Sequence, residues 1–153
     1  MKLLTPQCYN SLLAEIDNIK SVLMPDVAQE IAIARSHGDL RENAQYSSAK
    51  EKQRMIETRL QELENVISTH EVCDITKIQY TKVSFGATVK LHFLDDNSTK
   101  TFQILSDYDS NINNGTISIN TPIAKAILGL EVEDEAEIKI GAKVKNVKIS
   151  EIL

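Results

Sequence analysis

The stretch Ser36-His37-Gly38-Asp39-Leu40-Arg41-Glu42 separates two long segments in which apolar residues recur every three or four positions. That spacing lines up apolar side chains on one face of a helix. Gly38 can adopt the left-handed conformation that ends a helix. Asp39 and Glu42 match a capping box, which opens a new helix. Because the connection is so short, the two predicted helices must run antiparallel.

Each predicted helix carries a ladder of apolar residues for packing against the other helix. The first ladder consists of Leu12, Ile16, Ile19 and Leu23. The second consists of Ile56, Leu60, Leu63 and Ile67, with Ala49 and Gln53 leading into it. Thr5-Pro6 marks the start of the first helix, because proline at the first helical position loses no needed donor. The sequence therefore predicts an antiparallel coiled-coil hairpin within residues 1–75, with arms of about 30 residues and about 45 Å. Pro25 is expected to kink or split the first arm, since it lacks a backbone donor.

The pattern changes after about Thr76 to short segments rich in β-branched residues. The predicted strands cover residues 83–86, 87–93, 100–105, 115–119, 136–140 and 144–149. Hairpin turns are predicted at residues 95–98, 113–115 and 141–142. The segment from Thr121-Pro122 to Gly129 carries the start and stop signals of a short helix. Residues 76–153 are therefore expected to form a second, α+β domain, a small antiparallel sheet with one short helix.

Composition and charge exclude several classes of protein. The formal net charge of −5 argues against sequence-independent binding of free DNA or RNA, because such binding needs a basic face. No apolar run approaches the length of a membrane span, and the N-terminus lacks the apolar core of a signal peptide. Cys8 and Cys73 lie far apart, without the spacing of a metal site. We expect a reduced, cytoplasmic protein that does not enter the membrane and whose thiols are inert.

The turn between the two predicted helices concentrates charged residues. Asp39 and Glu42 lie three positions apart, on one face of a helix start. From residue 35 to residue 59, six basic residues oppose four acidic ones: Arg35, Arg41, Lys50, Lys52, Arg54 and Arg59 against Asp39, Glu42, Glu51 and Glu57. The residues alone leave two interpretations open, a helix cap worth about 1 kcal/mol among solvated charges or a functional site. No other constellation competes, because His37, His70 and His92 are scattered and no phosphate-binding loop is present.

Three motifs resemble those of the Gre family of bacterial transcript-cleavage factors. The most specific is Gly38-Asp39-Leu40-Arg41-Glu42-Asn43-Ala44-Gln45-Tyr46, continuing through Ala49-Lys50-Glu51; the others are Phe85-Gly86-Ala87-Thr88-Val89 and Ile119-Asn120-Thr121-Pro122-Ile123-Ala124-Lys125-Ala126-Ile127-Leu128-Gly129. The resemblance implies a coiled-coil hairpin followed by an FKBP-like domain. It also implies a transcription elongation factor that enters the secondary channel of RNA polymerase. There the factor would stimulate the polymerase's intrinsic cleavage of backtracked RNA, with no independent active site.

The resemblance also implies roles for individual residues. Asp39 and Glu42 would reach the polymerase active site and help hold its second Mg²⁺ and a water. The chain would hold no cofactor or metal alone, because two carboxylates bind Mg²⁺ poorly without further ligands. Asn43 and Tyr46 would support the tip of the hairpin.

The remaining implied roles concern binding surfaces. Candidates for contact with the nascent RNA 3′ end are Arg35, Arg41, Lys50 and Lys52. Candidates for docking at the outer rim of the channel are Thr121, Pro122 and Lys125. The implied partner is RNA polymerase, and any contact with DNA would be indirect. The protein is expected to be a monomer.

The sequence departs from the family pattern at two places. Leu23-Met24 stand before Pro25, where relatives often carry a basic pair, and Leu130 stands where a lysine often follows Gly129. These departures favour the less basic Gre type, which removes short RNA fragments. Two rival functions remain: a paralogue of the same fold that occupies the channel and inhibits, and a coiled-coil chaperone or prolyl isomerase. The two acids count against the first rival, and the scarcity of aromatic residues in the second half counts against the isomerase.

Overall fold

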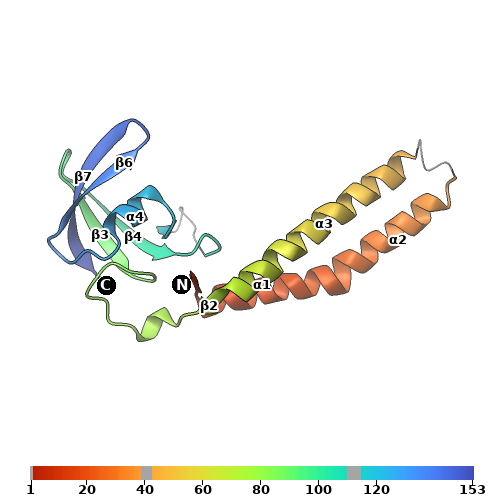
Figure 1. Ribbon diagram of the computed structural model, residues 1–153, viewed down its shortest axis with the longest axis horizontal. Coiled ribbons are helices and arrows are strands. Elements are labelled where there is room, and N and C mark those ends of the chain that lie inside the picture. Colours follow the sequence, from red (N-terminus) through yellow and green to blue (C-terminus); the bar gives the residue numbers. More distant parts are fainter. Residues whose placement is uncertain (1, 39–42, 110–114) are drawn as a thin grey trace. The chain divides into compact units, whose positions relative to one another are not determined.

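The computed structural model describes residues 2–38, 43–109 and 115–153 (Figure 1). The chain forms two compact units, one consisting of Tyr9–His70 and the other of Met1–Cys8 together with Glu71–Leu153. The sequence placed the division at residues 75/76 instead, with the whole N-terminal segment in the hairpin.

Two contacts explain why the segment before Tyr9 groups with the C-terminal unit. The Leu4 carbonyl accepts a hydrogen bond from the Cys73 N–H at 2.8 Å. Thr5 Oγ1 donates to Asp109 Oδ1 at 2.5 Å. Both partners are far away in sequence, so the local helix signals at Thr5-Pro6 could not reveal them.

The unit Tyr9–His70 is a helical hairpin, as predicted (Figure 1). The first arm consists of α1 (Pro6–Asn18), η1 (Ile19–Leu23) and α2 (Met24–Arg35), and the second arm is α3 (Ala44–Thr69). The predicted start of α1 is confirmed, because Thr5 Oγ1 accepts a hydrogen bond from the Cys8 N–H at 3.2 Å, in the manner of a helix cap.

Pro25 lies inside the first arm without splitting it. The preceding segment η1 is a π-helix, in which the N–H of Met24 bonds to the carbonyl of Ile19, five residues earlier. Proline lacks the donor that an α-helix needs, and its ring crowds the preceding turn. The wider π turn accommodates that ring, so the arm remains helical from Pro6 to Arg35.

A seam of buried apolar side chains runs along both arms. It comprises Leu12, Ile19, Val27, Ile31 and Ala34 on the first arm and Ala49, Leu63 and Val66 on the second. The predicted ladders are confirmed at Leu12, Ile19, Ala49 and Leu63, whereas Ile16, Leu23, Ile56, Leu60 and Ile67 are only half-buried. The register after the π-helix differs from that of a continuous α-helix, which is why Val27, Ile31 and Ala34 complete the seam.

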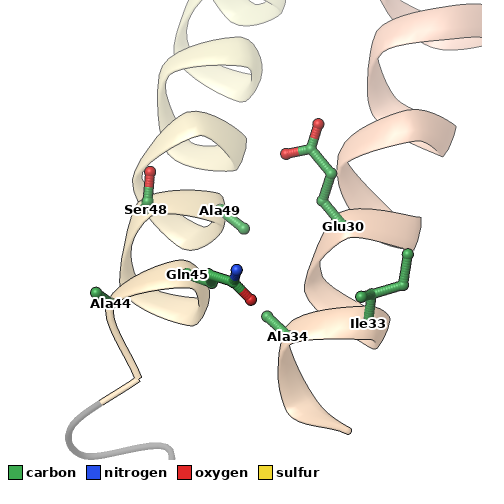
Figure 2. A pocket seen from close by; sticks show the side chains of 7 residues that line it. All are labelled: Glu30, Ile33, Ala34, Ala44, Gln45, Ser48 and Ala49. Atoms are coloured by element: carbon green, nitrogen blue, oxygen red, sulfur yellow. The ribbon is translucent and has the colours of Figure 1, made fainter. Parts of the chain in front are cut away.

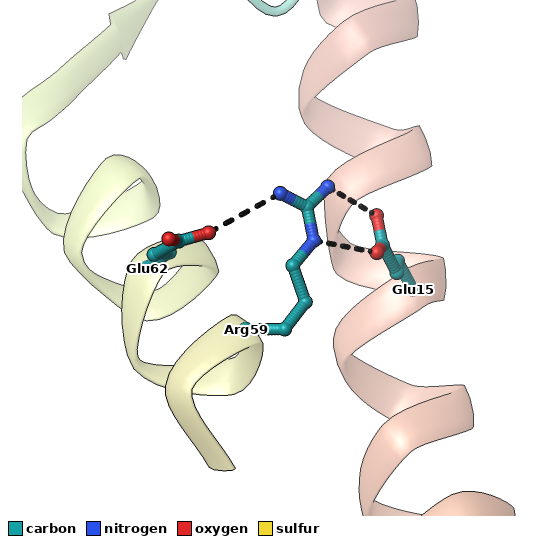
Figure 3. Close-up of polar contacts among 3 residues, drawn as sticks. All are labelled: Glu15, Arg59 and Glu62. Atoms are coloured by element: carbon teal, nitrogen blue, oxygen red, sulfur yellow. Dashed lines mark hydrogen bonds and ion pairs between the residues drawn. The ribbon is translucent and has the colours of Figure 1, made fainter. Parts of the chain in front are cut away.

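Ion pairs join the two arms outside the seam. Figure 3 shows the most extensive pair, in which the Arg59 guanidinium binds both carboxylate oxygens of Glu15, at 2.9 Å and 3.2 Å, and also reaches Glu62 at 3.4 Å. Lys20 pairs with Glu64 at 3.0 Å, and Lys52 pairs with Glu30 at 2.9 Å. All of these groups are partly exposed, so each ion pair contributes no more than about 1 kcal/mol to stability. Their main effect is to fix how the arms are aligned.

The C-terminal unit is built on a five-stranded sheet with the strand order β5-β4-β3-β7-β6. The strands are β3 (Thr88–Phe93), β4 (Ser98–Leu105), β5 (Thr116–Ser118), β6 (Glu135–Ile140) and β7 (Lys143–Ile152). Neighbouring strands pair antiparallel, except that β4 and β5 pair in parallel. The short strands β1 (Lys2–Leu4) and β2 (His70–Val72) form a separate two-stranded sheet.

Two sequence-based predictions about this unit are wrong. A hairpin was expected at residues 113–115, but β4 and β5 run in the same direction, so the chain crosses over between them. The sheet is therefore mixed and not wholly antiparallel. Residues 83–86 form no strand, because Gly86 lies in a turn with a φ of +89°. The α+β class and the hairpin of β6 and β7 around Gly141 are confirmed.

One short helix, α4 (Pro122–Ile127), contributes to the core of this unit, and a 3₁₀ turn, η2 (Ile75–Lys77), precedes the sheet. The buried cluster comprises Val83, Ala87, Val89, Leu91, Phe93, Ile104, Ile117, Ala124, Ile127, Ile138, Val147 and Ile149. Alternate residues of β3 belong to it, as expected for a strand with one buried face. The core fixes both the end of β4 and the position of α4, which matters for the docking candidates below.

Candidate functional site

Three of the predicted site residues, Asp39, Arg41 and Glu42, lie outside the described residues. The segment that carries them joins Gly38 to Asn43, which are both described. Gly38 has a φ of +110° and follows the last turn of α2, where a residue without a side chain is favoured. The N–H of Gly38 bonds to the carbonyl of Arg35 at 3.3 Å, so the end of the first arm is defined up to this residue.

Asn43 caps the second arm. Its Oδ1 accepts a hydrogen bond from the N–H of Tyr46 at 3.0 Å, and α3 begins at Ala44. The predicted capping box falls on Asp39 and Glu42, which lie outside the described residues, whereas the described start of α3 is capped by Asn43. The same Asn43 side chain donates from Nδ2 at 2.6 Å to the carbonyl of Ala34, near the end of α2, which also accepts from the N–H of His37 at 3.2 Å. An aspartate cannot make this second bond because it has no donor.

Tyr46 makes a second contact between the arms. The Arg35 guanidinium lies over the Tyr46 ring, 5.8 Å from its centroid. Such a cation–π contact is worth about 0.5–1 kcal/mol at an exposed site. Asn43 and Tyr46 were predicted to support the tip and Arg35 to contact RNA, and the structure brings all three together at the joined end of the hairpin.

The basic candidates differ in how far their charge is already compensated. Lys52 pairs with Glu30 across the arms, so its ammonium group is shared with a carboxylate. The Lys50 ammonium contacts the neutral amide of Gln53 at 3.1 Å. Among the residues that the structure describes, Arg35 and Lys50 have no carboxylate partner. These two are the better candidates for contact with a phosphate.

A groove that the sequence did not predict lies between the arms near their joined end. It has a volume of about 470 Å³ and is lined by Glu30, Ile33, Ala34, Ala44, Gln45, Ser48 and Ala49. Figure 2 shows Ala34 and Ala49 on facing helices and the Gln45 side chain extending from α3 towards α2. The groove exists because no large side chain fills the space between these small residues. The small residues Ala44, Ser48 and Ala49 on α3 were the available signal.

The docking candidates of the C-terminal unit share one helix start. Thr121 Oγ1 caps α4 by accepting a hydrogen bond from the Ala124 N–H at 3.3 Å, and it donates to the Ser118 carbonyl at 2.7 Å. Pro122 is the first residue of α4. Pro122 and Lys125 are exposed and Thr121 is half-buried, so all three side chains are accessible; together they are called the α4 patch.

The described part of the chain offers no metal site of its own and no membrane-spanning helix. Within residues 2–38, 43–109 and 115–153, no group of three or more His, Cys, Asp or Glu side chains is arranged to hold a metal ion. None of the described helices is both long enough and apolar enough to cross a membrane.

Comparisons with known proteins cover almost the whole chain. A family model described as "Transcription elongation factor, N-terminal" matches residues 2–72, and one described as "Transcription elongation factor, GreA/GreB, C-term" matches residues 78–153. Transcription elongation factor GreA of Thermodesulfovibrio yellowstonii is 40% identical over 149 residues, which cover 97% of this chain and 94% of the relative. The GreA protein of Ruegeria pomeroyi is 42% identical over 149 residues, covering 97% of this chain and 95% of the relative.

Among solved structures, the GreA factor homolog 1 protein of Thermus thermophilus is 19% identical with a TM-score of 0.46, covering 99% of this chain and 98% of that one. The family resemblance inferred from the three motifs is confirmed by the two family models and by the full-length relatives. The chain belongs to the GreA/GreB family of transcription elongation factors.

Proposed function

We propose that this protein binds RNA polymerase during elongation and stimulates the polymerase's own hydrolysis of backtracked nascent RNA. In this proposal the hairpin enters the secondary channel, and Asp39 and Glu42 reach the active site of the polymerase. The membership of the GreA/GreB family supports the role in elongation. The motif from Gly38 to Glu51 supports the more specific role in cleavage.

The observation that carries the proposal is the cap of α3. A helix start attracts acidic residues, so Asp39 and Glu42 could have been present only to open the second arm. Asn43 already provides that cap, with its Oδ1 bonded to the Tyr46 N–H. The two acids are therefore not needed to start α3, and a chemical role becomes the better explanation for them.

The chemistry suits a site that is shared between two proteins. Mg²⁺ prefers one or two carboxylates together with phosphate oxygens and waters. Asp39 and Glu42 would supply carboxylates to a two-metal centre whose other ligands belong to the polymerase and the RNA, where the metal activates a water for attack on the phosphodiester. The protein itself would need no independent active site.

The described part of the hairpin suits the task of delivering these groups. The arms are joined by a buried seam, and at their joined end by the bond from Asn43 to Ala34 and the contact of Arg35 with Tyr46. These contacts limit the motion of the two residues, Gly38 and Asn43, between which the acids lie in sequence. Arg35 and Lys50 would contact the phosphates of the extruded RNA.

The test separates a chemical role from a structural one. Asp39→Asn and Glu42→Gln keep the size and the hydrogen-bonding capacity of each side chain but remove its charge. We expect stimulated cleavage of a backtracked complex to fall by at least about a hundredfold, while the melting temperature and the affinity for polymerase stay unchanged. Both variants should then compete with the unaltered protein. Asp26→Asn and Glu57→Gln, the same changes at exposed positions along the arms, should retain full activity.

Normal cleavage by Asp39→Asn and Glu42→Gln would return these acids to a structural role. A protein that binds polymerase but slows elongation without stimulating cleavage would instead be an inhibitory paralogue. Fragment length in the same assay tests the type of factor, because the less basic hairpin predicts mainly short RNA fragments.

A further inference from the structure

The parallel pairing of β4 and β5 brings two loop segments together. Because both strands run in the same direction, their last residues lie side by side, with Leu105 opposite Ser118. The chain continues from β4 into the turn 106–109 and from β5 into the segment 119–121, which leads to α4. The docking candidates therefore lie next to a turn that is more than ten residues away in sequence.

Asp107 connects these two segments through both of its carboxylate oxygens. Its Oδ1 accepts a hydrogen bond from the hydroxyl of Ser118. Its Oδ2 accepts one from Nδ2 of Asn120 at 2.8 Å. The Ser118 hydroxyl oxygen accepts in turn from the backbone N–H of Asn120 at 3.0 Å. One carboxylate thus fixes the side chains of two residues immediately before the Thr121 cap.

The network continues into the start of α4. The carbonyl of Ser118 accepts hydrogen bonds from the N–H of Thr121 at 3.0 Å and from its hydroxyl at 2.7 Å. Thr121 Oγ1 caps α4 at the Ala124 N–H. The position of Pro122, the first residue of α4, therefore depends on a chain of bonds that begins at Asp107.

The turn that carries Asp107 is itself held in place. Ser106 is buried, and its Oγ accepts hydrogen bonds from the N–H groups of Tyr108 at 3.2 Å and Asp109 at 3.1 Å. The same hydroxyl donates to the Asp109 carboxylate at 2.7 Å. The hydrogen bonds of Ser106 keep this turn in one conformation. A carboxylate on such a turn can position the groups that donate to it.

We propose that Asp107 is a positioning residue for polymerase binding, which holds Asn120, Thr121 and Pro122 in the arrangement that docks on RNA polymerase. The inference rests on the proposed function and on docking through the α4 patch. Asp107 and Asn120 are exposed, and neither belongs to the hydrophobic core of the unit. Loss of the carboxylate therefore changes the docking geometry and leaves the fold intact.

The experiment measures stimulated cleavage of a backtracked complex at a series of factor concentrations. It yields two quantities, the concentration for half-maximal stimulation and the rate at saturation. For Asp107→Ala we expect the half-maximal concentration to rise about tenfold, with the saturated rate within twofold of the unaltered protein. A role in general stability would lower the melting temperature without separating these two quantities.

Asp96 offers a matched control in the same unit. It is exposed, and its Oδ1 accepts hydrogen bonds from the hydroxyl of Ser98 at 2.6 Å and from the Ser98 N–H at 2.9 Å. Asp96→Ala removes the same charge and a similar pair of bonds, but from the turn between β3 and β4. We expect it to leave the half-maximal concentration unchanged. An equal effect of Asp96→Ala would overturn the inference, because charge alone would then explain the loss.

A reciprocal exchange keeps the inference testable if Asp107→Ala fails to fold. Asn120→Asp places a carboxylate opposite Asp107 and should weaken binding, since the two oxygens repel. Asp107→Asn combined with Asn120→Asp restores one donor and one acceptor with the original arrangement of partners, so binding should recover. Failure of the double variant to recover, together with normal binding by Asp107→Asn, would overturn the proposed pairing.

The outcomes also distinguish this inference from the proposed function. If the unaltered protein neither binds polymerase nor stimulates cleavage, the proposed function is wrong. If it does both, but Pro122→Ala and Lys125→Glu bind normally, the α4 patch is not the docking site and the inference fails with it. If those two variants bind weakly while Asp107→Ala binds normally, only the positioning role of Asp107 is wrong.

Discussion

Asn43 Nδ2 donates to the Ala34 carbonyl at 2.6 Å, and this single bond connects the last turn of α2 to the residue that caps α3. Few side chains can serve both helices at once. The amide group of asparagine combines an acceptor for the N–H of Tyr46 with a donor for the carbonyl of Ala34. The two arms are thereby joined on both sides of the segment that carries Asp39 and Glu42 in the sequence.

Asn43→Asp should separate the two functions of this side chain. Aspartate caps a helix as well as asparagine does, but it has no donor, and its charge faces the Ala34 carbonyl. We expect the free energy of unfolding of the hairpin to fall by about 1–2 kcal/mol. The N–H of Tyr46 should remain protected from hydrogen exchange in this variant, whereas Asn43→Ala should lose that protection as well.

Asn18→Asp is the matched control for this change. Asn18 is the last residue of α1 and is exposed. The change there should alter stability by no more than about 0.5 kcal/mol. If Asn43→Asp were as stable as the unaltered protein, the bond to Ala34 would have no role in joining the arms.

The ion pair of Arg59 with Glu15 should contribute a small, salt-sensitive coupling. Both side chains are nearly half exposed, with relative accessibilities of 46% and 41%. A double-mutant cycle with Arg59→Gln and Glu15→Gln should give a coupling free energy of about 0.5–1 kcal/mol. The coupling should shrink at high salt because of screening. A coupling that is unaffected by salt would mean that packing of the arginine stem, and not its charge, joins the arms.

Much of the fold was readable from the sequence because its signals are local. Glycine, proline and cap residues mark the start of α1, the end of α2 and the start of α4, and these elements are where they were predicted. The errors arise where two local signals compete or where a partner is distant. The sequence did not point to Asn43 as the cap of α3, because its bond to the carbonyl of Ala34 is made to the other arm, nine positions away.

The candidate site was readable only in part, for the same reason. The acidic motif is a sequence signal, but the pairing of Lys52 with Glu30 spans 22 positions and changes which basic residues have uncompensated charge. The contacts of Asp107 with Ser118 and Asn120 depend on the parallel pairing of β5, which the turn-like residues 113–115 concealed. Long-range pairing of this kind leaves no periodic pattern in the sequence.

Gly86→Ala should strongly destabilise the C-terminal unit. Gly86 has a φ of +89°, and an added Cβ would overlap the hydroxyl of Tyr80 and lie 2.8 Å from Cβ of Ile75. Tyr80 cannot easily move, because its hydroxyl donates to the Phe85 carbonyl at 2.8 Å. We expect a loss of about 3 kcal/mol or more in the free energy of unfolding, measured with urea, from strain and overpacking together.

Gly129→Ala separates these two contributions. Gly129 has a similar φ of +83°, but nothing lies within 4 Å of an added Cβ. Only the cost of holding alanine in a left-handed backbone conformation should remain, about 1–2 kcal/mol in the free energy of unfolding. Equal losses at the two positions would show that the packing of Ile75 and Tyr80 against Gly86 contributes nothing.

The thiol of Cys8 should be inert in the folded protein. Burial raises the pKa of Cys8 from 9.0 to about 12, and the nearby Asp109 carboxylate adds to the rise. With Cys73 replaced by serine, iodoacetamide at pH 8 should alkylate Cys8 only after denaturation, as judged by mass spectrometry.

The folded state holds the thiol proton more tightly than the unfolded chain does, so the stability that Cys8 contributes is intact below pH 9 and is lost as the pH rises from 9.0 towards about 12. Urea unfolding at pH 8 and pH 10 should therefore show a larger loss for the Cys73→Ser protein than for the same protein with Cys8→Ala. Identical losses, or rapid alkylation of the folded protein, would mean that the thiol is accessible and that its pKa is close to that of a free cysteine.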